Sequence, residues 1–242
     1  MTNTTTPDVM FSIILPVYNQ APYIADIIHS YQKELKNLPA RCEFLLVVNG
    51  DKDASLDICQ KLSRQYENIR VFHSAKKGWG IAVRLGFKEA RGNLICYTNS
   101  ARTTAKDLLL FLLYAFANPE TVVKANRKIR ENWVRRLGSL LYNLQCRALF
   151  GLAYWDINGT PKVFPRKFDL LLHLSKNDNL IDLEFNYVCQ KNHYPVIEVP
   201  VLSYKRQGGK STTGYFSAVE MYCKAFQFWA AIKQNLKDEK SS

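Results

Sequence analysis

The sequence predicts an α/β fold, with a mixed and mostly parallel sheet flanked by helices in a single domain. Short apolar runs alternate with stretches of helical periodicity through the first half of the chain, which is typical of parallel strands joined by helices. The chain has 242 residues and 47% hydrophobic content, enough to bury one substantial core. It contains no internal repeat and no low-complexity linker that would divide it into smaller domains.

The expected elements follow from these runs and from the residues at their ends. Strands are expected over residues 11–17, 42–49, 69–73, 94–98 and 121–125, with helices over residues 22–37, 53–66, 78–91 and 105–117. Thr104 followed by Asp107 predicts the N-terminal cap of the last of these helices. Beyond residue 126 the alternation stops. There the pattern predicts a basic helical stretch over 127–151, a polar turn over 155–164, a helix over 182–192, a strand over 194–204 and a final helix over 215–235.

Charge and residue usage narrow the function classes. The formal net charge of +12 predicts a surface that attracts anions such as nucleotides and phospholipid headgroups. Nucleic acid is not an expected partner, because the sequence has no finger, no helix-turn-helix signature and no basic run with interleaved aromatic residues. The six cysteines lack paired spacing, which argues against a zinc site or a disulfide framework and for a reducing compartment.

Two segments bear on the cellular location. The longest apolar run, residues 108–117, is shorter than the roughly 20 residues that cross a bilayer, so it predicts a buried helix. Residues 1–10 are expected to form a disordered lead, because their start, MTNTTTPD, has neither the cationic nor the apolar stretch of a signal peptide. Both features favour a cytoplasmic protein.

Polar segments follow the first four predicted strands, at the edge where open parallel sheets bind ligands. They are PVYNQ (16–20), NGDKDAS (49–55), KKGWGIAVRLGFKEARG (76–92) and TNSAR (98–102). Their order resembles that of the family 2 glycosyltransferases with a GT-A fold. Chains of that family typically read PxYNE, then DDGSxD, then a GxGxAxxxG helix, then Asp-X-Asp.

The resemblance continues into the second half of the chain. RRLGSLLYN (135–143), DINGTPKVFPR (156–166), LIDLEFNYVCQKNHYPVIEVPV (180–201) and KRQGGKST (205–212) look like segments of the polyprenyl-phosphate sugar synthases, the dolichyl-phosphate mannose synthase branch. The matches cover roughly residues 11–213. They imply a nucleotide-binding half over 11–125 and an acceptor half over 126–213, followed by an amphipathic helix and polar tail over 214–242.

The resemblance implies a nucleoside-diphosphate sugar donor at the sheet edge, with Pro16 and Tyr18 packing on the base and ribose. A proline-set turn offers a rigid apolar wall, and a tyrosine ring can stack or hydrogen-bond there. The other interpretation is that Pro16 only ends a strand and that Tyr18 is half-buried. The expected donor-binding residues are Pro16, Tyr18, Gln20, Asn49, Lys77, Gly78, Asn99 and Ala101.

Several acids that the family usually carries at this edge are replaced. Gln20 stands in place of Glu, Val48 and Asn49 in place of two acids, and Asn99 and Ala101 in place of Asp-X-Asp. An amide oxygen is a weak neutral ligand and a methyl group is none, so we expect no cofactor and no divalent metal. Positive charge for the leaving diphosphate would come from Arg102, a candidate catalytic residue, and from Lys76 and Lys77. The alternative for Arg102 is a solvated loop arginine.

The acceptor half supplies further candidates. Asp156, the second candidate catalytic residue, could act as a base or orient the acceptor, or it could be a turn aspartate that bonds its own backbone. Asp182 and Glu184 form a second acidic pair, or are first-turn residues favoured by the helix dipole. Basic and hydroxyl residues would bind phosphate, unless each is simply solvated. These are Arg127, Arg130, Arg135, Arg136, Arg206, Lys210 and Ser211.

The last predicted helix combines apolar and basic side chains. They are Phe216, Met221, Tyr222, Phe226, Trp229 and Ile232, with Lys224, Lys233 and Lys237. Such a stripe can lie on anionic lipid headgroups, giving peripheral membrane contact. The alternative is that it packs on its own domain or on a partner subunit of a homo-oligomer.

These observations predict a glycosyltransferase that moves a sugar from a nucleoside-diphosphate sugar to a polyprenyl phosphate or another lipid acceptor at the inner face of a membrane, as in cell-envelope polysaccharide or glycolipid synthesis. The alternative is a catalytically inactive relative that binds a nucleotide, a phosphorylated lipid or a partner protein as a regulator. Turnover of the donor distinguishes the two.

Overall fold

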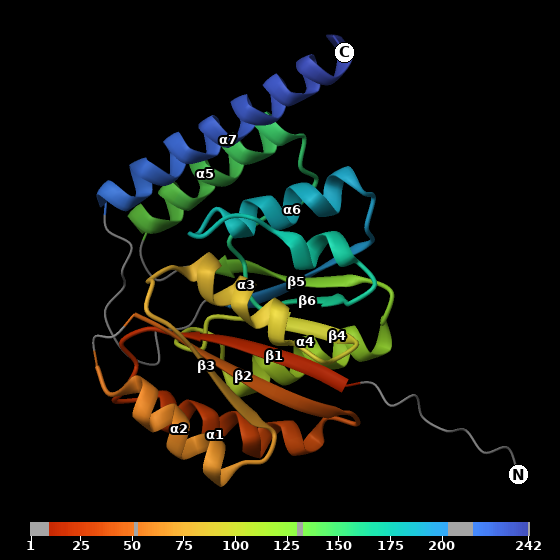
Figure 1. Cartoon of the computed structure of the whole chain (residues 1–242). Helices are drawn as coiled ribbons and strands as arrows, with labels where there is room; N and C mark the ends of the chain where they lie inside the picture. Colours follow the sequence, from red (N-terminus) through yellow and green to blue (C-terminus); the bar gives the residue numbers. More distant parts are fainter. Residues whose placement is uncertain (1–9, 51–52, 130–132, 203–214, 242) are drawn as a thin grey trace, which may run out of the picture.

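A seven-stranded sheet forms the centre of the molecule in the computed structural model, which describes residues 10–50, 53–129, 133–202 and 215–241 (Figure 1). The strand order is β3-β2-β1-β4-β6-β5-β7. The strands are β1 Met10–Val17, β2 Arg41–Asn49, β3 Ile69–Ser74, β4 Leu94–Tyr97, β5 Val122–Ile129, β6 Lys162–Pro165 and β7 Val196–Leu202. Only β6 runs antiparallel to its neighbours β4 and β5, so the predicted mixed and mostly parallel α/β sheet is confirmed.

Helices cover both faces of the sheet, and the strands divide their side chains between them. On β1, Ile13 and Leu15 face one core cluster, with α1 Ile24–Glu34, α2 Ser55–Gln65 and α4 Ala105–Ala117. Ile14 faces the other cluster, with α3 Trp79–Glu89 and α6 Ile181–Lys191. Because the central strands are buried on both faces, they are mostly apolar and do not alternate with polar residues. Ser12 of β1 and Glu43 of β2 are buried exceptions, and Ser12 donates to Glu43 at 2.6 Å.

Two helices pack together beyond this sandwich (Figure 1). They are α5 Trp133–Phe150 and α7 Tyr215–Ser241, and they lie side by side. Met221 and Tyr222 pack into the small cluster beneath α5, which supports packing on the protein's own domain for that part of the last helix. Phe226, by contrast, is 52% exposed. The side chain of Phe216 lies outside the described residues.

Several predicted boundaries differ from the structure. The basic stretch expected to be helical from residue 127 is still strand β5 up to Ile129, because that segment pairs with β7 as far as Leu202, and the helix begins at Trp133. The expected polar turn 155–164 ends in β6, a strand of four residues. The last helix continues to Ser241, since its end contains Lys, Leu and Glu but no Gly or Pro.

The predicted cap of α4 is confirmed, because the Asp107 amide donates to Thr104 Oγ1 at 3.1 Å. The end of the helix expected over residues 22–37 is a short 3-10 helix, Leu35–Asn37, and a second 3-10 helix, Asp169–His173, was not predicted. The expected disordered lead lies outside the described residues except for Met10, which begins β1. Within the described part of the chain, no helix has the length and apolar composition needed to cross a bilayer.

Candidate functional site

Tyr18 lies just after β1, partly exposed at the carboxyl edge of the sheet. The ammonium nitrogen of Lys77 lies 5.3 Å from the centre of its ring, a cation–π contact. Gly50 also packs against the ring: its φ of +80° favours glycine, and a Cβ there would lie 3.2 Å from Tyr18 Cε2. An exposed aromatic ring beside a lysine can receive a planar base and an anionic group.

Asn49, expected to contact the donor, has both polar atoms of its side chain engaged within the protein. Its Nδ2 donates to the Val17 carbonyl at 3.1 Å, and its Oδ1 accepts from the Gly78 amide at 3.1 Å. The residue is only 4% exposed. A carboxylate could not donate to Val17, so an amide is the group that can join β1, β2 and the start of α3 in this way.

The loop after β4 is packed by neutral groups. Ser100 is buried and donates to Gln20 Oε1 at 2.8 Å, and Ala101 is buried with its amide donating to Asn99 Oδ1 at 3.2 Å. Pro16 accepts a long contact of 3.5 Å from Gln20 Nε2. These side chains do not fit a divalent metal, because amides and a hydroxyl bonded to one another supply no carboxylate. Among the described residues, no three His, Cys, Asp or Glu side chains lie close enough to hold a metal ion.

The three cations predicted for this edge have different surroundings. Lys77 is exposed, whereas Arg102 is partly buried and its amide donates to the Asn99 carbonyl at 2.9 Å. Lys76 is also exposed. The structure therefore places one cation beside the Tyr18 ring and another within the loop that follows β4.

Asp53 is a residue at this edge that the sequence interpretation missed. Its carboxylate accepts from the Ala21 and Ser55 amides, each at 3.0 Å, and so joins the loop after β1 to the start of α2. Burial opposes its charge, but the hydrogen bonds from Ser55 and Ala21 hold the pKa of Asp53 below its usual range. The signal was present, because Asp53 is the acid of NGDKDAS that keeps the last position of the family's DDGSxD pattern.

Gly78 and Gly80 allow close packing within the protein. A Cβ on Gly80 would lie 2.2 Å from the Lys176 carbonyl oxygen, and one on Gly78 would lie 2.6 Å from that of Asn177. Glu184 holds the same loop, accepting from the Lys176 amide at 2.9 Å and from Ser175. The predicted donor residue Gly78 and the predicted acceptor residue Glu184 thus lie on the two sides of one loop, residues 175–178.

Asp156, a predicted catalytic residue, lies on a turn between α5 and β6. It is 4% exposed, and its φ of +48° is in the left-handed region. Arg127 binds it bidentately, with Nε to Oδ2 at 2.6 Å and Nη2 to Oδ1 at 2.7 Å, and the Arg127 amide adds a bond of 2.9 Å. These three bonds from Arg127 make the carboxylate an anchor for the guanidinium.

A cavity of about 240 Å³ opens beside this ion pair. Its lining is Asn126, Arg127, Arg136, Ser139, Leu140, Asn143, Trp155 and Asp156. We call it the arginine pocket. Among the described residues of its lining, two arginines and one carboxylate give it a positive character. Of the predicted phosphate-binding set, Arg130, Arg206, Lys210 and Ser211 lie outside the described residues, as does the side chain of Arg135.

Asp182, at the start of α6, has contacts that differ from those of Glu184. It is 4% exposed, accepts from the Tyr97 hydroxyl at 2.9 Å and forms an ion pair with Lys162. Burial and the charge of Asp182 raise the pKa of Tyr97 well above its ordinary value. Lys162 and Lys124, both fully buried, were missed by the sequence interpretation. Their signal was a lysine inside an apolar strand, in VVKA and PKVF.

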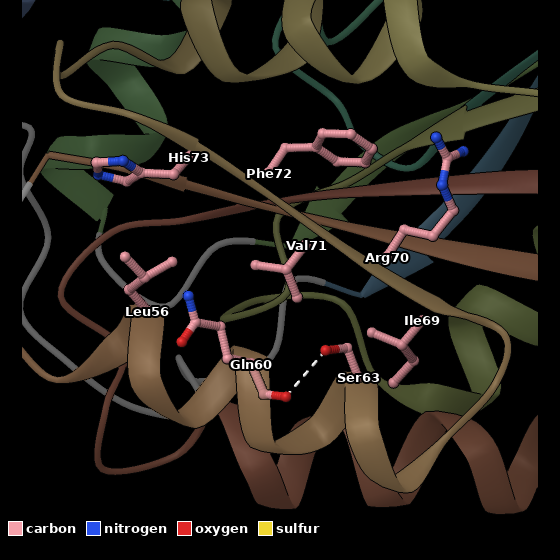
Figure 2. Close-up of a pocket in the computed structure, with 8 residues that line it drawn as sticks. All are labelled: Leu56, Gln60, Ser63, Ile69, Arg70, Val71, Phe72 and His73. Carbon is pink, nitrogen blue, oxygen red and sulfur yellow. Dashed lines mark hydrogen bonds between the residues drawn. The ribbon is translucent and has the colours of Figure 1, made fainter.

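Figure 2 shows a second hollow, an open groove of about 670 Å³ between α2 and the edge strand β3. Leu56, Gln60 and Ser63 come from the helix, and β3 supplies the rest of the lining. Four strands separate β3 from β5 in the sheet. The groove contains no predicted site residue, so the arginine pocket and the Tyr18 edge remain the candidate site.

Comparison with known proteins identifies the family. Residues 12–169, more than half of the chain, match the model of glycosyl transferase family 2. The undecaprenyl-phosphate 4-deoxy-4-formamido-L-arabinose transferase of Sodalis glossinidius (strain morsitans) is 23% identical over 214 residues, which are 87% of this chain and 64% of that relative. This chain therefore spans a little under two thirds of the relative's length.

Solved structures show the same architecture. Glucosyl-3-phosphoglycerate synthase from Mycobacterium tuberculosis, in complex with Mn²⁺, UDP and phosphoglyceric acid, superposes with a TM-score of 0.66 at 14% identity, covering 90% of this chain and 76% of that one. Mannosyl-3-phosphoglycerate synthase from Rubrobacter xylanophilus gives 0.62 at 16% identity, covering 96% and 75%. The fold is that of the GT-A glycosyltransferases, and the chain belongs to glycosyl transferase family 2.

Proposed function

We propose that this transferase moves a sugar from a nucleoside-diphosphate sugar to a lipid-linked phosphate at a membrane surface. The observation that carries the proposal is the arginine pocket, where Asp156 fixes the Arg127 guanidinium beside Arg136. The Sodalis relative is named for a transferase of undecaprenyl phosphate, a lipid-linked phosphate, which supports the same class of acceptor.

The geometry of Arg127 suits a phosphate in this pocket. Asp156 uses the Nε and one Nη N–H, and a guanidinium has five N–H groups in all. The remaining three, with Arg136 and the Ser139 hydroxyl, supply donors for phosphate oxygens. A phosphate is already anionic at neutral pH. Asp156 therefore serves to orient Arg127, and no side chain needs to remove a proton from the acceptor.

Fixed cations stabilise the departing diphosphate in this proposal. Loss of the donor's sugar leaves negative charge on the diphosphate, which a family-type site would neutralise with a metal. Here the loop of Asn99, Ser100 and Ala101 is neutral and bonded to itself and to Gln20. Lys77 beside Tyr18, and Arg102 in that loop, would supply charge-assisted hydrogen bonds instead.

Exposed leucines on α5 support contact with a membrane. Leu137, Leu140, Leu141 and Leu144 are each 44% to 50% exposed, and their spacing places them on one stripe of the helix. The helix sequence, WVRRLGSLLYNLQCRALF, carries three arginines and no carboxylate, which favours an anionic lipid surface. Leu140 also lines the arginine pocket. A lipid phosphate has the same arrangement, an anion followed by an apolar chain.

Transfer of radiolabelled sugar tests the function directly. Purified protein is incubated with UDP-, GDP- or dTDP-sugars and with undecaprenyl phosphate in detergent, and the lipid phase is counted. We expect label in the lipid with one of the donors, and loss of that label in the Arg127→Ala and Arg136→Ala variants. Donor binding in calorimetry without transfer to any acceptor would support the inactive relative instead.

A further inference from the structure

Two fully buried lysines lie opposite each other on neighbouring strands. Lys124 of β5 and Lys162 of β6 are register partners, and neither is exposed to solvent. Burying an ammonium group is costly unless it is paired and hydrogen-bonded. Two such groups side by side, each next to a buried valine of its own strand, require a structural or functional reason.

Their ammonium groups bind three successive backbone carbonyls. Lys124 donates to the carbonyl of Trp155 and, at 3.4 Å, to that of Asp156. Lys162 donates to the carbonyl of Ile157 at 3.1 Å. The two lysines therefore hold the turn Trp155–Ile157, the same turn that carries Asp156 into contact with Arg127.

Each lysine has its own acid, so the cluster is electrically balanced. Lys124 pairs with Glu198 of β7 at 2.9 Å, and Glu198 also accepts from the Trp155 amide at 2.9 Å. Lys162 pairs with Asp182 at the start of α6. Glu198 and Lys124 together thus bind both the N–H and the C=O of Trp155.

The turn needs such support because of its conformation. Asp156 has a φ of +48°, where a residue with a side chain is disfavoured, and this conformation directs the carboxylate toward both the amide and the guanidinium of Arg127. If the turn relaxed, the carboxylate would move and Arg127 would lose its fixed orientation at the arginine pocket.

We propose that Lys124 and Lys162 are positioning residues that hold the turn Trp155–Ile157, so that Asp156 fixes the Arg127 guanidinium for binding an oxyanion in the arginine pocket. The proposal rests on the proposed function of that pocket as a phosphate site. It assigns the two lysines no contact with substrate, since their ammonium groups are enclosed by the turn and the acids.

Sulfate is a suitable probe for this role, because it is a tetrahedral oxyanion whose charge does not change between pH 6 and 10. Its dissociation constant is measured by calorimetry for the whole chain and for Lys124→Met and Lys162→Met, which keep the length of the side chain but remove the charge. We expect roughly tenfold weaker binding in each variant, as in Asp156→Asn. Lys106→Met, a change of an exposed lysine on α4, is the matched control and should bind as the parent does.

A double-mutant cycle separates positioning from a general loss of stability. If the lysine acts through Asp156, adding Lys124→Met to Asp156→Asn should weaken sulfate binding by no more than about twofold beyond the single variant. If Lys162→Met fails to fold, Lys162→Met with Asp182→Asn removes both charges and gives the same comparison.

The pH dependence supplies a second readout. Burial lowers the pKa of Lys162 to about 8, against the opposing effect of Asp182, with Lys124, Asp156 and Tyr97 also facing it. Sulfate binding should therefore weaken above about pH 8. Because the folded pKa lies below the ordinary lysine value of about 10.4, the unfolded state binds more protons in this range, and this group's contribution to stability rises with pH. If Lys162 had only a structural role, raising the pH would not weaken sulfate binding while the contribution of Lys162 to stability increases.

The signal of the Arg127 Nε–H in NMR tests the positioning without any ligand. It should be protected from exchange in the parent chain and lose that protection in folded Lys124→Met. Folded lysine variants with a protected Arg127 Nε–H and unchanged sulfate binding would overturn the proposal. A different pair of results would separate the two proposals. If the lysine variants lose the protection of the Arg127 Nε–H, but Arg127→Ala and Arg136→Ala bind sulfate as the parent chain does, the lysines position Arg127 and the pocket is not a phosphate site.

Discussion

The two ends of this site solve the problem of buried polar groups differently. Around Tyr18, amides and hydroxyls are bonded to one another, as in the contacts of Asn49 with Val17 and of Ser100 with Gln20. Around Asp156, buried charges of opposite sign are paired. The difference leaves one end with amides, hydroxyls and an Asp53 carboxylate already bonded to backbone amides, whereas at the other end two arginines line a cavity.

The largest effect should come from breaking the charged end. Asp156→Asn leaves the Arg127 guanidinium without its anion in a buried setting, so the free energy of unfolding should fall by about 3 kcal/mol. Sugar transfer should fall about 100-fold, because Arg127 is no longer held in place. Urea denaturation and the transfer assay measure the two effects, and Asp57→Asn, at an exposed acid of α2, should change neither.

The neutral end should resist an added charge. Asn49→Asp replaces the donor to the Val17 carbonyl with an acceptor and should lower the free energy of unfolding by about 2 kcal/mol at pH 7. Burial raises the pKa of such a carboxyl, so the loss should shrink as the pH falls toward about 4, where the acid is protonated. Asn99→Asp, at a partly exposed position, should change stability by less than about 0.5 kcal/mol. Equal effects at the two sites would contradict the role assigned to Asn49.

The role of the exposed leucine stripe on α5 in membrane binding can be tested against exposed leucines on α4. Leu141→Ser with Leu144→Ser should weaken binding to vesicles containing phosphatidylglycerol by about tenfold, because two exposed apolar groups are removed. Leu110→Ser with Leu113→Ser changes leucines of similar exposure on α4 and should leave binding unchanged. Sedimentation with vesicles gives the affinities. A shift from dimer to monomer with unaltered vesicle binding would assign the α5 stripe to a second copy of the chain.

Cysteine labelling should give the smallest difference between the ends. Burial raises the pKa of Cys59 and of Cys146 to about 12, so their intrinsic reactivities are matched. Cys59 lies in the main core cluster and Cys146 in the small cluster beneath α5 and α7, which should open at a lower free energy. Iodoacetamide should therefore modify Cys146 before Cys59 under native conditions, with the exposed Cys223 reacting ahead of both. Mass spectrometry of the peptides would show the reverse order if α5 were the more stable element.

Much of the neutral end could be predicted from the sequence, because short apolar strands and the rule that ligands bind at strand ends bring PVYNQ, NGDKDAS and TNSAR together. What could not be predicted was that Asn49 and Gly78 hydrogen-bond within the protein and not to a donor. Those contacts join residues 29 and 32 positions apart, and their partners are backbone groups that have no signature in the sequence.

The charged end was predicted less completely. Asp156, Arg127 and Arg136 were identified and do line one pocket. Asp182 and Glu184 were paired because they resemble the family's acid-bearing helix start. Residues two apart on a helix point in different directions, and in the structure Asp182 accepts from Tyr97 whereas Glu184 accepts from Ser175. Lys124 and Lys162 were overlooked because each lies within a short run of apolar residues, VVKA and PKVF, and the second run was expected to be part of a turn.

The central claim is that side-chain cations take the place of a metal ion at a sugar-transfer site. The direct measurement is the rate of sugar transfer by the purified chain in excess EDTA, with and without added Mg²⁺ or Mn²⁺. The account predicts a rate in EDTA within about twofold of the rate with metal, and a loss of transfer in Arg102→Ala and Lys77→Ala. Transfer that stops in EDTA and returns with Mn²⁺ would contradict it.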